Sequence, residues 1–443
     1  MFKGTREQRG WYFFDWAVSA YSTTVGAVFL GPYLTSIAEA AAKDTGGMLY
    51  PFGPSIPIAA GSFYAYMTSL SVLLQVFFLP ILGAVADYTA LKRRMMGIFA
   101  YISTVAVILM FFMQGTDYLF GGILYLVANL TFGASMVFYN AFLPEIATPD
   151  ERDAVSSRGF AFGYLGGGLL LILNLALFLS YEQIGIDGGL AVRICLASAG
   201  VWMAIFIPIT LRSLPNTAAV HDLQKGQSVV TAGFAQLAET LRNSVRYPQT
   251  LLFLGAYLLY NDGVQTVIAM SSTFGTQELG MESQTLIITI LMVLFVAWFG
   301  ALGFNQVARR IGAKKSILIS LVVWTSLTVV SYFIVKGSVV QFLLLGAGIA
   351  VVLGGTQALS RSLFAQMIPK GKESEYYSLY EVSERGTSWI GPLVFGLVYQ
   401  FTNSYRLALS MIGVFFVVGF LLLIFVNVRR AINEAGNEAP VVV

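Results

Sequence analysis

The chain has 443 residues, of which 57% are hydrophobic and only 11% are charged. So little charge cannot solvate the surface of a soluble protein of this length, so the composition excludes that class and predicts a surface facing lipid. The net charge of +3 comes from short basic clusters between apolar runs, where a membrane protein keeps its cytoplasmic anchors, and we expect no nucleic-acid partner. One cysteine, Cys195, and one histidine, His221, exclude an intramolecular disulfide and a Cys/His metal site.

Apolar runs close to the roughly 20 residues that span a bilayer recur along the whole chain. We therefore predict an all-α membrane protein with twelve transmembrane helices, six in each half. The predicted spans are 16–38, 63–84, 95–113, 119–143, 160–179, 190–211, 251–273, 286–304, 317–335, 340–362, 380–401 and 407–426.

The loops between these spans alternate in charge. One set carries Lys92, Arg93, Arg94, Arg152, Arg158, Arg309, Arg310, Lys314 and Lys315, whereas the other set holds little more than Lys43, Lys336 and Arg406. Because Lys and Arg are retained on the cytoplasmic side, this asymmetry predicts that both termini are cytoplasmic. Arg193 lies near the opposite boundary, and we interpret it as a side chain that extends towards the headgroups.

The longest polar stretch separates two halves. We expect an N-terminal six-helix bundle at 1–212, a cytoplasmic linker at 213–249, and a C-terminal six-helix bundle with a short tail at 250–443. Within the linker, Phe234, Leu237, Leu241 and Val245 recur at helical spacing, which is compatible with an amphipathic helix on the membrane surface. A solvated linker helix without a function of its own is the favoured alternative.

The two halves resemble each other in sequence. FFDWAVSAY, with Asp15, is similar to LYNDGVQTV, with Asp262, and SSRGFAFGYLGGG is similar to SERGTSWIGPLVFG. The basic turn DYTALKRR after the second span is similar to RRIGAKK after the eighth. Internal duplication with a binding site between the halves is a transporter architecture.

The loop after the second span carries a glycine, three residues, an aspartate and a basic cluster, Gly83 to Arg94. This pattern resembles the signature of the major facilitator superfamily and implies its fold of two pseudo-symmetric six-helix bundles. The glycine allows close helix packing, and Asp87 can accept hydrogen bonds from the N-terminus of a neighbouring helix. We assign Gly83, Asp87 and Arg93 to an inner gate, together with Glu381 and Arg385 at the entrance of the eleventh span.

The alternative to a gate is a charge cluster that only fixes topology, but it does not explain Asp87 at that spacing. Tyr88 replaces the usual basic residue after the aspartate. The second copy of the loop has Asn305 and Arg309 in place of the glycine and the aspartate, so a gating role for that copy does not follow.

Longer strings resemble a narrower family. DWAVSAY, FYNAFLPEIA, GYLGGGLLL, YNDGVQTV and LGGTQALSRSLFAQMIP are similar to the autophagy-related vacuolar effluxers and their prokaryotic relatives. The resemblance implies a transporter, with amino-acid efflux as the function attached to the fungal vacuolar members. We expect a multi-pass protein of a prokaryotic cytoplasmic membrane, or of the vacuolar membrane in a eukaryote.

Ionisable residues inside apolar spans are costly, about 2.5 to 3.5 kcal/mol each on insertion scales, and so indicate function. Asp262 lies sixteen residues beyond Arg246, on the order of 20 Å into the membrane at about 1.5 Å per helical residue. A carboxylate at this depth can bind and release a proton or attract a substrate ammonium group. The structural alternative is a carboxylate that caps a helix break at residues 261–263.

Arg361 is the basic counterpart. It lies about 12 Å before Pro369 by the same rise, and its planar fork of donors can hold a carboxylate of a substrate or of Asp15. Asp15 and Glu381 lie nearer the cytoplasmic ends of their spans, and both also fit an inner charge network. Polar residues in comparable positions of the two halves complete the predicted substrate and proton pathway: Tyr139 and Asn140 in the fourth span, and Gln357 and Ser360 in the tenth.

No nucleophile-and-base set, phosphate loop or nucleotide motif is visible, so we expect neither an enzyme nor a cofactor. The leading interpretation is a secondary active transporter of a small polar solute, an amino acid or similar zwitterion. We expect proton-coupled efflux by alternating access, in a monomer. The alternatives are a lipid or amphiphile translocator with the same fold, and a sensor that binds a solute without moving it.

Overall fold

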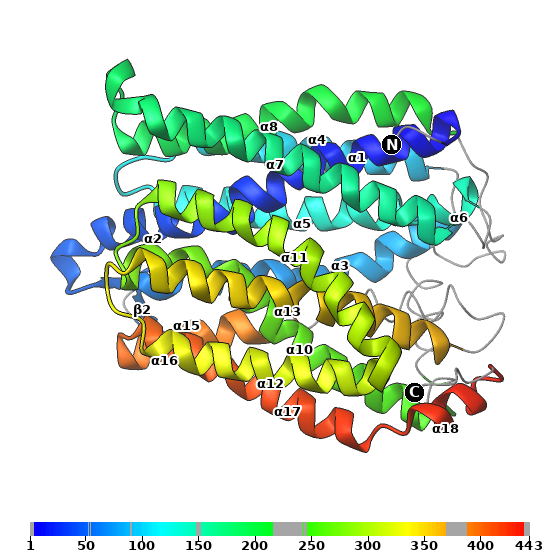
Figure 1. Ribbon diagram of the computed structural model, residues 1–443. Coiled ribbons are helices and arrows are strands. Elements are labelled where there is room, and N and C mark those ends of the chain that lie inside the picture. The colour runs from blue at the N-terminus through cyan, green and yellow to red at the C-terminus, as the bar shows by residue number, and fades with distance from the viewer. Residues whose placement is uncertain are drawn as a thin grey trace. The chain divides into compact units, whose positions relative to one another are not determined.

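A computed structural model describes residues 4–51, 53, 55–88, 91–147, 152–215, 242, 246–368 and 388–437, which are almost entirely helical (Figure 1). The chain divides into two compact units, Met1–Ala235 and Gln236–Val443. The division falls inside the stretch 213–249 that the sequence marks as a linker. Nearly all of the amphipathic helix predicted there lies outside the described residues.

In unit 1 the predicted spans correspond to long helices. The elements are α1 (Arg6–Ala20), the π-helix η1 (Tyr21–Phe29), α2 (Leu30–Ala41), α3 (Phe63–Tyr88), α4 (Lys92–Leu109), α5 (Tyr118–Asn140), α6 (Leu143–Ile146), α7 (Arg152–Ile184) and α8 (Gly188–Ser213). Short 3-10 turns lie at Lys43–Thr45, Ala60–Ser62 and Met110–Phe112. Strands β1 (Met48–Leu49) and β2 (Ile58–Ala59) form an antiparallel pair between α2 and α3.

Unit 2 has the same kind of construction. Its elements are α10 (Pro248–Thr273), the π-helix η5 (Phe274–Glu278), α11 (Ser283–Ile311), α12 (Ala313–Tyr332), α13 (Val339–Gln366), α15 (Ile390–Thr402), α16 (Tyr405–Met411), α17 (Gly413–Phe425) and α18 (Val428–Glu434).

Nine helices in the described part of the chain are long and apolar enough to cross a membrane. The other three predicted spans fall on an interrupted helix, on a continuous helix whose side chains are only partly described, and on a partly described helix. Span 16–38 covers the end of α1, all of η1 and most of α2, span 286–304 lies in α11, and span 380–401 overlaps α15 and undescribed residues. The structure is therefore consistent with twelve spans.

Helix packing repeats between the two units. In unit 1 the first helix, α1, packs on the fifth and sixth, α7 and α8, while α5 packs on α3 and α4, and α4 also packs on α8. Unit 2 has the corresponding five pairs, α10 with α15 and α17, α13 with α11 and α12, and α12 with α17. The sequence similarity between the halves thus has a counterpart in how each unit is built.

A π-helical stretch follows the first α-helix of each unit. In unit 1 it is η1, within the first predicted span, and in unit 2 it is η5, which continues α10. Backbone hydrogen bonds of the π type are uncommon and occur often at functional sites, because the extra residue per turn changes which side chains face a neighbour.

Large apolar side chains lie on the outside of both units. Phe401 and Phe425 are 79% and 72% exposed, and many other Phe, Leu, Ile and Val side chains of the long helices are also exposed. Such a surface is stable in lipid and not in water, because lipid tails solvate apolar side chains as well as a protein core does. The fold agrees with the composition in assigning the chain to a bilayer.

Candidate functional site

Asp262 lies in the middle of α10 and is 1% exposed. Its Oδ2 atom accepts a hydrogen bond of 2.9 Å from the backbone N–H of Gly391. Its Oδ1 atom is also buried and has no hydrogen-bond partner among the described residues. Asp262 is therefore a deep carboxyl group with one oxygen held and one oxygen unused.

The partner of Asp262 is a helix N-terminus. Helix α15 begins at Ile390, so the N–H of Gly391 has no acceptor within its own helix and needs one from elsewhere. A Cβ atom at position 391 would lie 2.0 Å from Oγ1 of Thr266 and 2.9 Å from Oδ1 of Asp262, so glycine is required for this approach. Helix α10 runs unbroken through residues 261–263, and the helix end capped by Asp262 belongs to α15.

Asp15 is the corresponding carboxyl group of unit 1. It lies in α1, is 9% exposed, and accepts at Oδ2 a hydrogen bond of 2.6 Å from the hydroxyl of Tyr139 in α5. Glycine again lies against the carboxyl group, because a Cβ at Gly159 in α7 would be 2.6 Å from the same oxygen. Two residues predicted for the pathway, Asp15 and Tyr139, are thus in direct contact.

Tyr139 is held by residues of α1. Its ring stacks on Trp11 at 4.3 Å and on Phe14 at 4.8 Å between ring centroids. The indole N–H of Trp11 also donates to the backbone oxygen of Tyr139 at 3.0 Å. Because these side chains are buried, the packing of the Tyr139 ring on Trp11 and Phe14 positions its hydroxyl on Asp15.

In unit 2 the predicted residues of α13 have different surroundings. Ser360 is buried, and its hydroxyl lies 2.6 Å from the hydroxyl of Tyr260 in α10. Gln357 is half-buried, as is Asn140 at the end of α5. Arg361 is exposed and makes no ion pair with Asp262, although both side chains belong to the described part of the chain.

The predicted inner gate is only partly described. Helix α3 extends through Gly83 and Asp87, but the side-chain environment of both residues lies outside what the structure describes, and Glu381 and Arg385 lie outside the described residues altogether. Arg93, at the start of α4, donates to the backbone oxygen of Leu214 at 2.9 Å. The gate therefore stays a prediction.

The sequence analysis missed a partly buried ion pair in unit 1. Lys92, treated as one of several topology charges, is 3% exposed and pairs with Glu145 of α6. Its ammonium group also donates to the backbone oxygen of Ala141 at 3.3 Å and lies 5.5 Å from the ring centroid of Phe142. The signal was available, because Glu145 lies in the string FYNAFLPEIA that carries the family resemblance.

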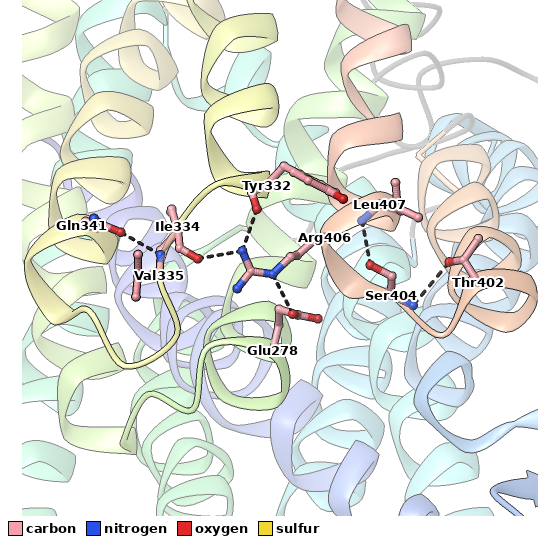
Figure 2. A network of polar contacts seen from close by, with 9 residues as sticks. All are labelled: Glu278, Tyr332, Ile334, Val335, Gln341, Thr402, Ser404, Arg406 and Leu407. Atoms are coloured by element: carbon pink, nitrogen blue, oxygen red, sulfur yellow. Dashed lines mark hydrogen bonds and ion pairs between the residues drawn. The ribbon is translucent and has the colours of Figure 1, made fainter.

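Arginines connect helix ends in each unit. In unit 2, Arg406 of α16 pairs with Glu278 at 2.8 Å and donates to the backbone oxygens of Tyr332 and Ile334 at 2.6 and 2.7 Å (Figure 2). In unit 1, Arg193 of α8 donates to the backbone oxygen of Phe111 at 3.4 Å and to Gln114 at 3.2 Å. Each arginine thus connects the start of the sixth helix of its unit to the end of the third, a role that sequence reasoning did not assign to either residue.

Within the described residues no group of three or more His, Cys, Asp and Glu side chains could hold a metal ion. The acidic residues with unusual surroundings are single carboxyl groups, and the arrangement can bind protons or one cationic group at each.

Comparison with known proteins gives consistent results. The family described as "Vacuole effluxer Atg22 like" matches residues 3–436. A Bacillus subtilis protein, "Uncharacterized MFS-type transporter YxiO", is 29% identical over 98% of this chain and 99% of its own length. "Autophagy-related protein 22-1" of Penicillium rubens is 23% identical over 97% of this chain and 91% of its own length.

Solved structures show the same fold. A structure of a point mutant of the nucleoside transporter NupG aligns with a TM-score of 0.67 at 15% identity and covers 95% of this chain and 98% of its own. A D-xylose–proton symporter aligns with a TM-score of 0.65 at 14% identity and covers 95% of this chain and 97% of its own. Identities this low establish the architecture and leave the solute open.

Proposed function

Because the chain belongs to the family of Atg22-like vacuole effluxers, a group of multi-pass transporters of the major facilitator type, we propose that it exports an amino acid or similar zwitterion in exchange for protons. The transport mechanism is alternating access between the six-helix bundles 1–212 and 250–443, connected by the linker 213–249. Bacterial and fungal relatives fit the inner membrane of a prokaryote or the vacuolar membrane.

The observation that carries the proposal is the state of Asp262. Its carboxyl group is buried in the middle of a membrane-spanning helix, with one oxygen bound to Gly391 and the other unpartnered among the described residues. A buried carboxylate without a cation is costly, and a proton or an ammonium group removes that cost. Proton coupling and binding of a zwitterion's ammonium group both use this property.

Arg361 is the proposed partner for the solute's carboxylate. It lies in α13, one residue after Ser360, and its exposed guanidinium is available for bidentate binding. In this conformation Arg361 and Asp262 are not paired, so the solute or a conformational change brings them into one site. Arg361→Lys keeps the charge but loses the fork, and should weaken solute binding more than coupling.

The inner gate completes the proposal. We assign Gly83, Asp87, Arg93, Glu381 and Arg385 to the closing of the cytoplasmic side. Asp87→Asn keeps the side-chain shape but removes the charge, so transport should slow while the yield of folded protein stays the same. Unchanged transport rates would mean that the loop only fixes the membrane topology and does not act as a gate.

The function is tested in proteoliposomes with a panel of amino acids, dipeptides, a nucleoside, a pentose and a fluorescent phospholipid, each with and without a pH gradient. The nucleoside and the pentose are included because two solved structures with the same fold are named as a nucleoside transporter and a D-xylose–proton symporter. Gradient-driven movement of an amino acid supports the proposal. Binding without movement would identify a sensor, movement of fluorescent phospholipids instead of solutes would identify a lipid translocator, and either result would overturn the proposal.

A further inference from the structure

We propose that the transporter has two proton sites, one in each unit, and that Asp15 and Asp262 each hold a proton in the conformation seen here. The inference rests on the proposed function and adds to it a second proton site, at Asp15; if both protons move with each solute, the coupling ratio is two protons per solute. Both carboxyl groups are buried, lack an ion-pair partner among the described residues and lie against a glycine of the fifth helix.

Burial sets these two residues apart. Within the part of the chain that the structure describes, Asp15 and Asp262 are the two acidic side chains classed as buried, with 9% and 1% exposure. The acidic residues that form ion pairs, Glu145, Glu278 and Glu434, are all more exposed. Where a described carboxylate pairs with Lys or Arg, it therefore does so in a more exposed position than Asp15 or Asp262.

Neither buried carboxyl group has such a partner. No described Lys or Arg forms an ion pair with Asp15 or with Asp262. Each accepts one hydrogen bond at Oδ2 from a neutral donor, the phenol of Tyr139 for Asp15 and the backbone N–H of Gly391 for Asp262. One neutral donor does not replace the hydration that a buried carboxylate loses, whereas a neutral carboxylic acid needs no such compensation.

Among the side chains that the structure describes, the elements packed on Asp15 contribute no compensating charge. Helix α5 contributes Tyr139, and α7 contributes Tyr164 and the exposed Arg158, which is not ion-paired with Asp15. Helix α8 also packs on α1, and its basic residues, Arg193 and Arg212, lie near its two ends.

The same holds for Asp262. Helices α15 and α17, which pack on α10, contain no ionisable acid or base within their bounds, apart from Tyr399 in α15. Helix α13 also packs on α10, where the hydroxyl of Ser360 forms a hydrogen bond with that of Tyr260. Arg361 of the same helix is exposed and forms no ion pair with Asp262. The basic residues of α18, Arg429 and Arg430, are exposed at the end of the unit.

Both sites are closed by a glycine of the fifth helix. A Cβ at Gly159 would lie 2.6 Å from Oδ2 of Asp15, and a Cβ at Gly391 would lie 2.9 Å from Oδ1 of Asp262. The backbone of α7 therefore lies against the carboxyl group of Asp15 on α1, and the backbone of α15 lies against that of Asp262 on α10. Release of either proton requires this contact to open, which couples protonation to movement of the fifth helix against the first in each unit.

Infrared difference spectroscopy of the purified protein in lipid vesicles tests the inference without any solute. A protonated carboxylic acid has a carbonyl-stretching band separate from the bands of carboxylates. Between neutral and alkaline pH we expect two such bands to disappear. Asp15→Asn should remove one band and Asp262→Asn the other, whereas Glu282→Gln, at an exposed residue, should remove neither.

A second pair of variants addresses the risk that an Asp→Asn protein does not fold. Tyr139→Phe removes the phenol donor and should shift the Asp15 band alone, and Gly391→Ala displaces the N–H donor and should shift the Asp262 band alone. An unshifted spectrum in Tyr139→Phe overturns the Asp15 site.

The outcomes separate this inference from the proposed function. If one band is present and only Asp262→Asn removes it, the second site is wrong while proton-coupled export through Asp262 stands. If neither substitution removes a band, both residues are ionised in this conformation and the inference is wrong. Solute export in the panel experiment that does not respond to a pH gradient would instead overturn the proposed coupling, whatever the spectra show.

Discussion

Asp262 and Gly391 lie 129 residues apart in the sequence, and the carboxyl group of Asp262 accepts a hydrogen bond of 2.9 Å from the backbone N–H of Gly391. The contact joins the middle of α10 to the N-terminus of α15, the first and fifth helices of unit 2. In unit 1 the equivalent carboxyl group, that of Asp15, accepts its hydrogen bond from a side chain, the phenol of Tyr139, and not from the backbone. The two units thus keep a buried carboxyl group on the first helix and hold it by different donors.

Gly391→Ala should separate α15 from Asp262. The new Cβ would lie 2.0 Å from Oγ1 of Thr266, closer than any real contact, so the helix end must move and the hydrogen bond to Asp262 is lost. We expect destabilisation of about 1 to 3 kcal/mol, the usual cost of overpacking, measured by thermal unfolding in detergent.

The matched control is Gly255→Ala in α10, where an added Cβ meets nothing within 4 Å. It should be neutral or stabilising by up to about 1 kcal/mol, because alanine favours helix over glycine. Thr266→Ala combined with Gly391→Ala should recover part of the loss. Equal effects of Gly391→Ala and Gly255→Ala would contradict the close approach.

Lys92→Met should destabilise unit 1 because it leaves Glu145 without its cation next to the buried end of α4. Removing one partner of a buried pair costs about 3 to 5 kcal/mol, and we expect less here because Glu145 is 22% exposed. The double variant Lys92→Met/Glu145→Gln should be more stable than Lys92→Met. Arg430→Met, which breaks the pair of a 60% exposed Arg430 with Glu434, should change stability by less than about 1 kcal/mol.

Arg406→Lys should loosen the connection between α16, η5 and the end of α12. Lysine keeps the charge for Glu278 but cannot also reach the two backbone oxygens that the guanidinium holds (Figure 2). Faster amide hydrogen exchange at residues 332–337 is the expected result. Unchanged exchange there, with intact helices elsewhere, would mean that Arg406 is only a surface charge.

The topology is tested by labelling. Single cysteines at Thr45 and at Gln227, in a Cys195→Ser background, should react with a membrane-impermeant reagent from opposite sides of the membrane, Thr45 from outside. This follows from the Lys and Arg asymmetry of the loops. Reaction of both from the same side would remove the basis for placing the termini in the cytoplasm.

Much of the fold could be predicted because a bilayer imposes length and composition on each span. The long apolar runs and the repeated motifs indicated two similar halves, and the paired helices of the two units agree with that. The interruptions of the first span by η1 and of the last between α16 and α17 were not predicted, since hydropathy is insensitive to the backbone hydrogen-bond pattern.

The side-chain partners were harder to predict. Sequence reasoning singled out Asp262 by its depth, but it could not identify the N–H of Gly391 as its hydrogen-bond donor, because any residue except proline carries a backbone N–H at a helix end. It placed Tyr139 in the pathway without linking it to Asp15, which lies 124 residues away. Lys92 was interpreted as a topology charge because positive loop residues are normally solvated, whereas its side chain is 3% exposed and pairs with Glu145.

The most direct test of proton coupling through Asp262 compares two fluxes of one labelled amino acid in proteoliposomes. Asp262→Asn should lose accumulation driven by a pH gradient yet still exchange labelled for unlabelled solute, while Glu282→Gln behaves as the unmodified protein. With the membrane potential set to zero, a tenfold proton gradient is worth about 1.4 kcal/mol per proton. Two protons per solute should therefore support about hundredfold accumulation of the amino acid in vesicles that contain the unmodified protein. Gradient-driven accumulation by Asp262→Asn with the usual pH dependence would contradict the account and make this carboxyl group structural.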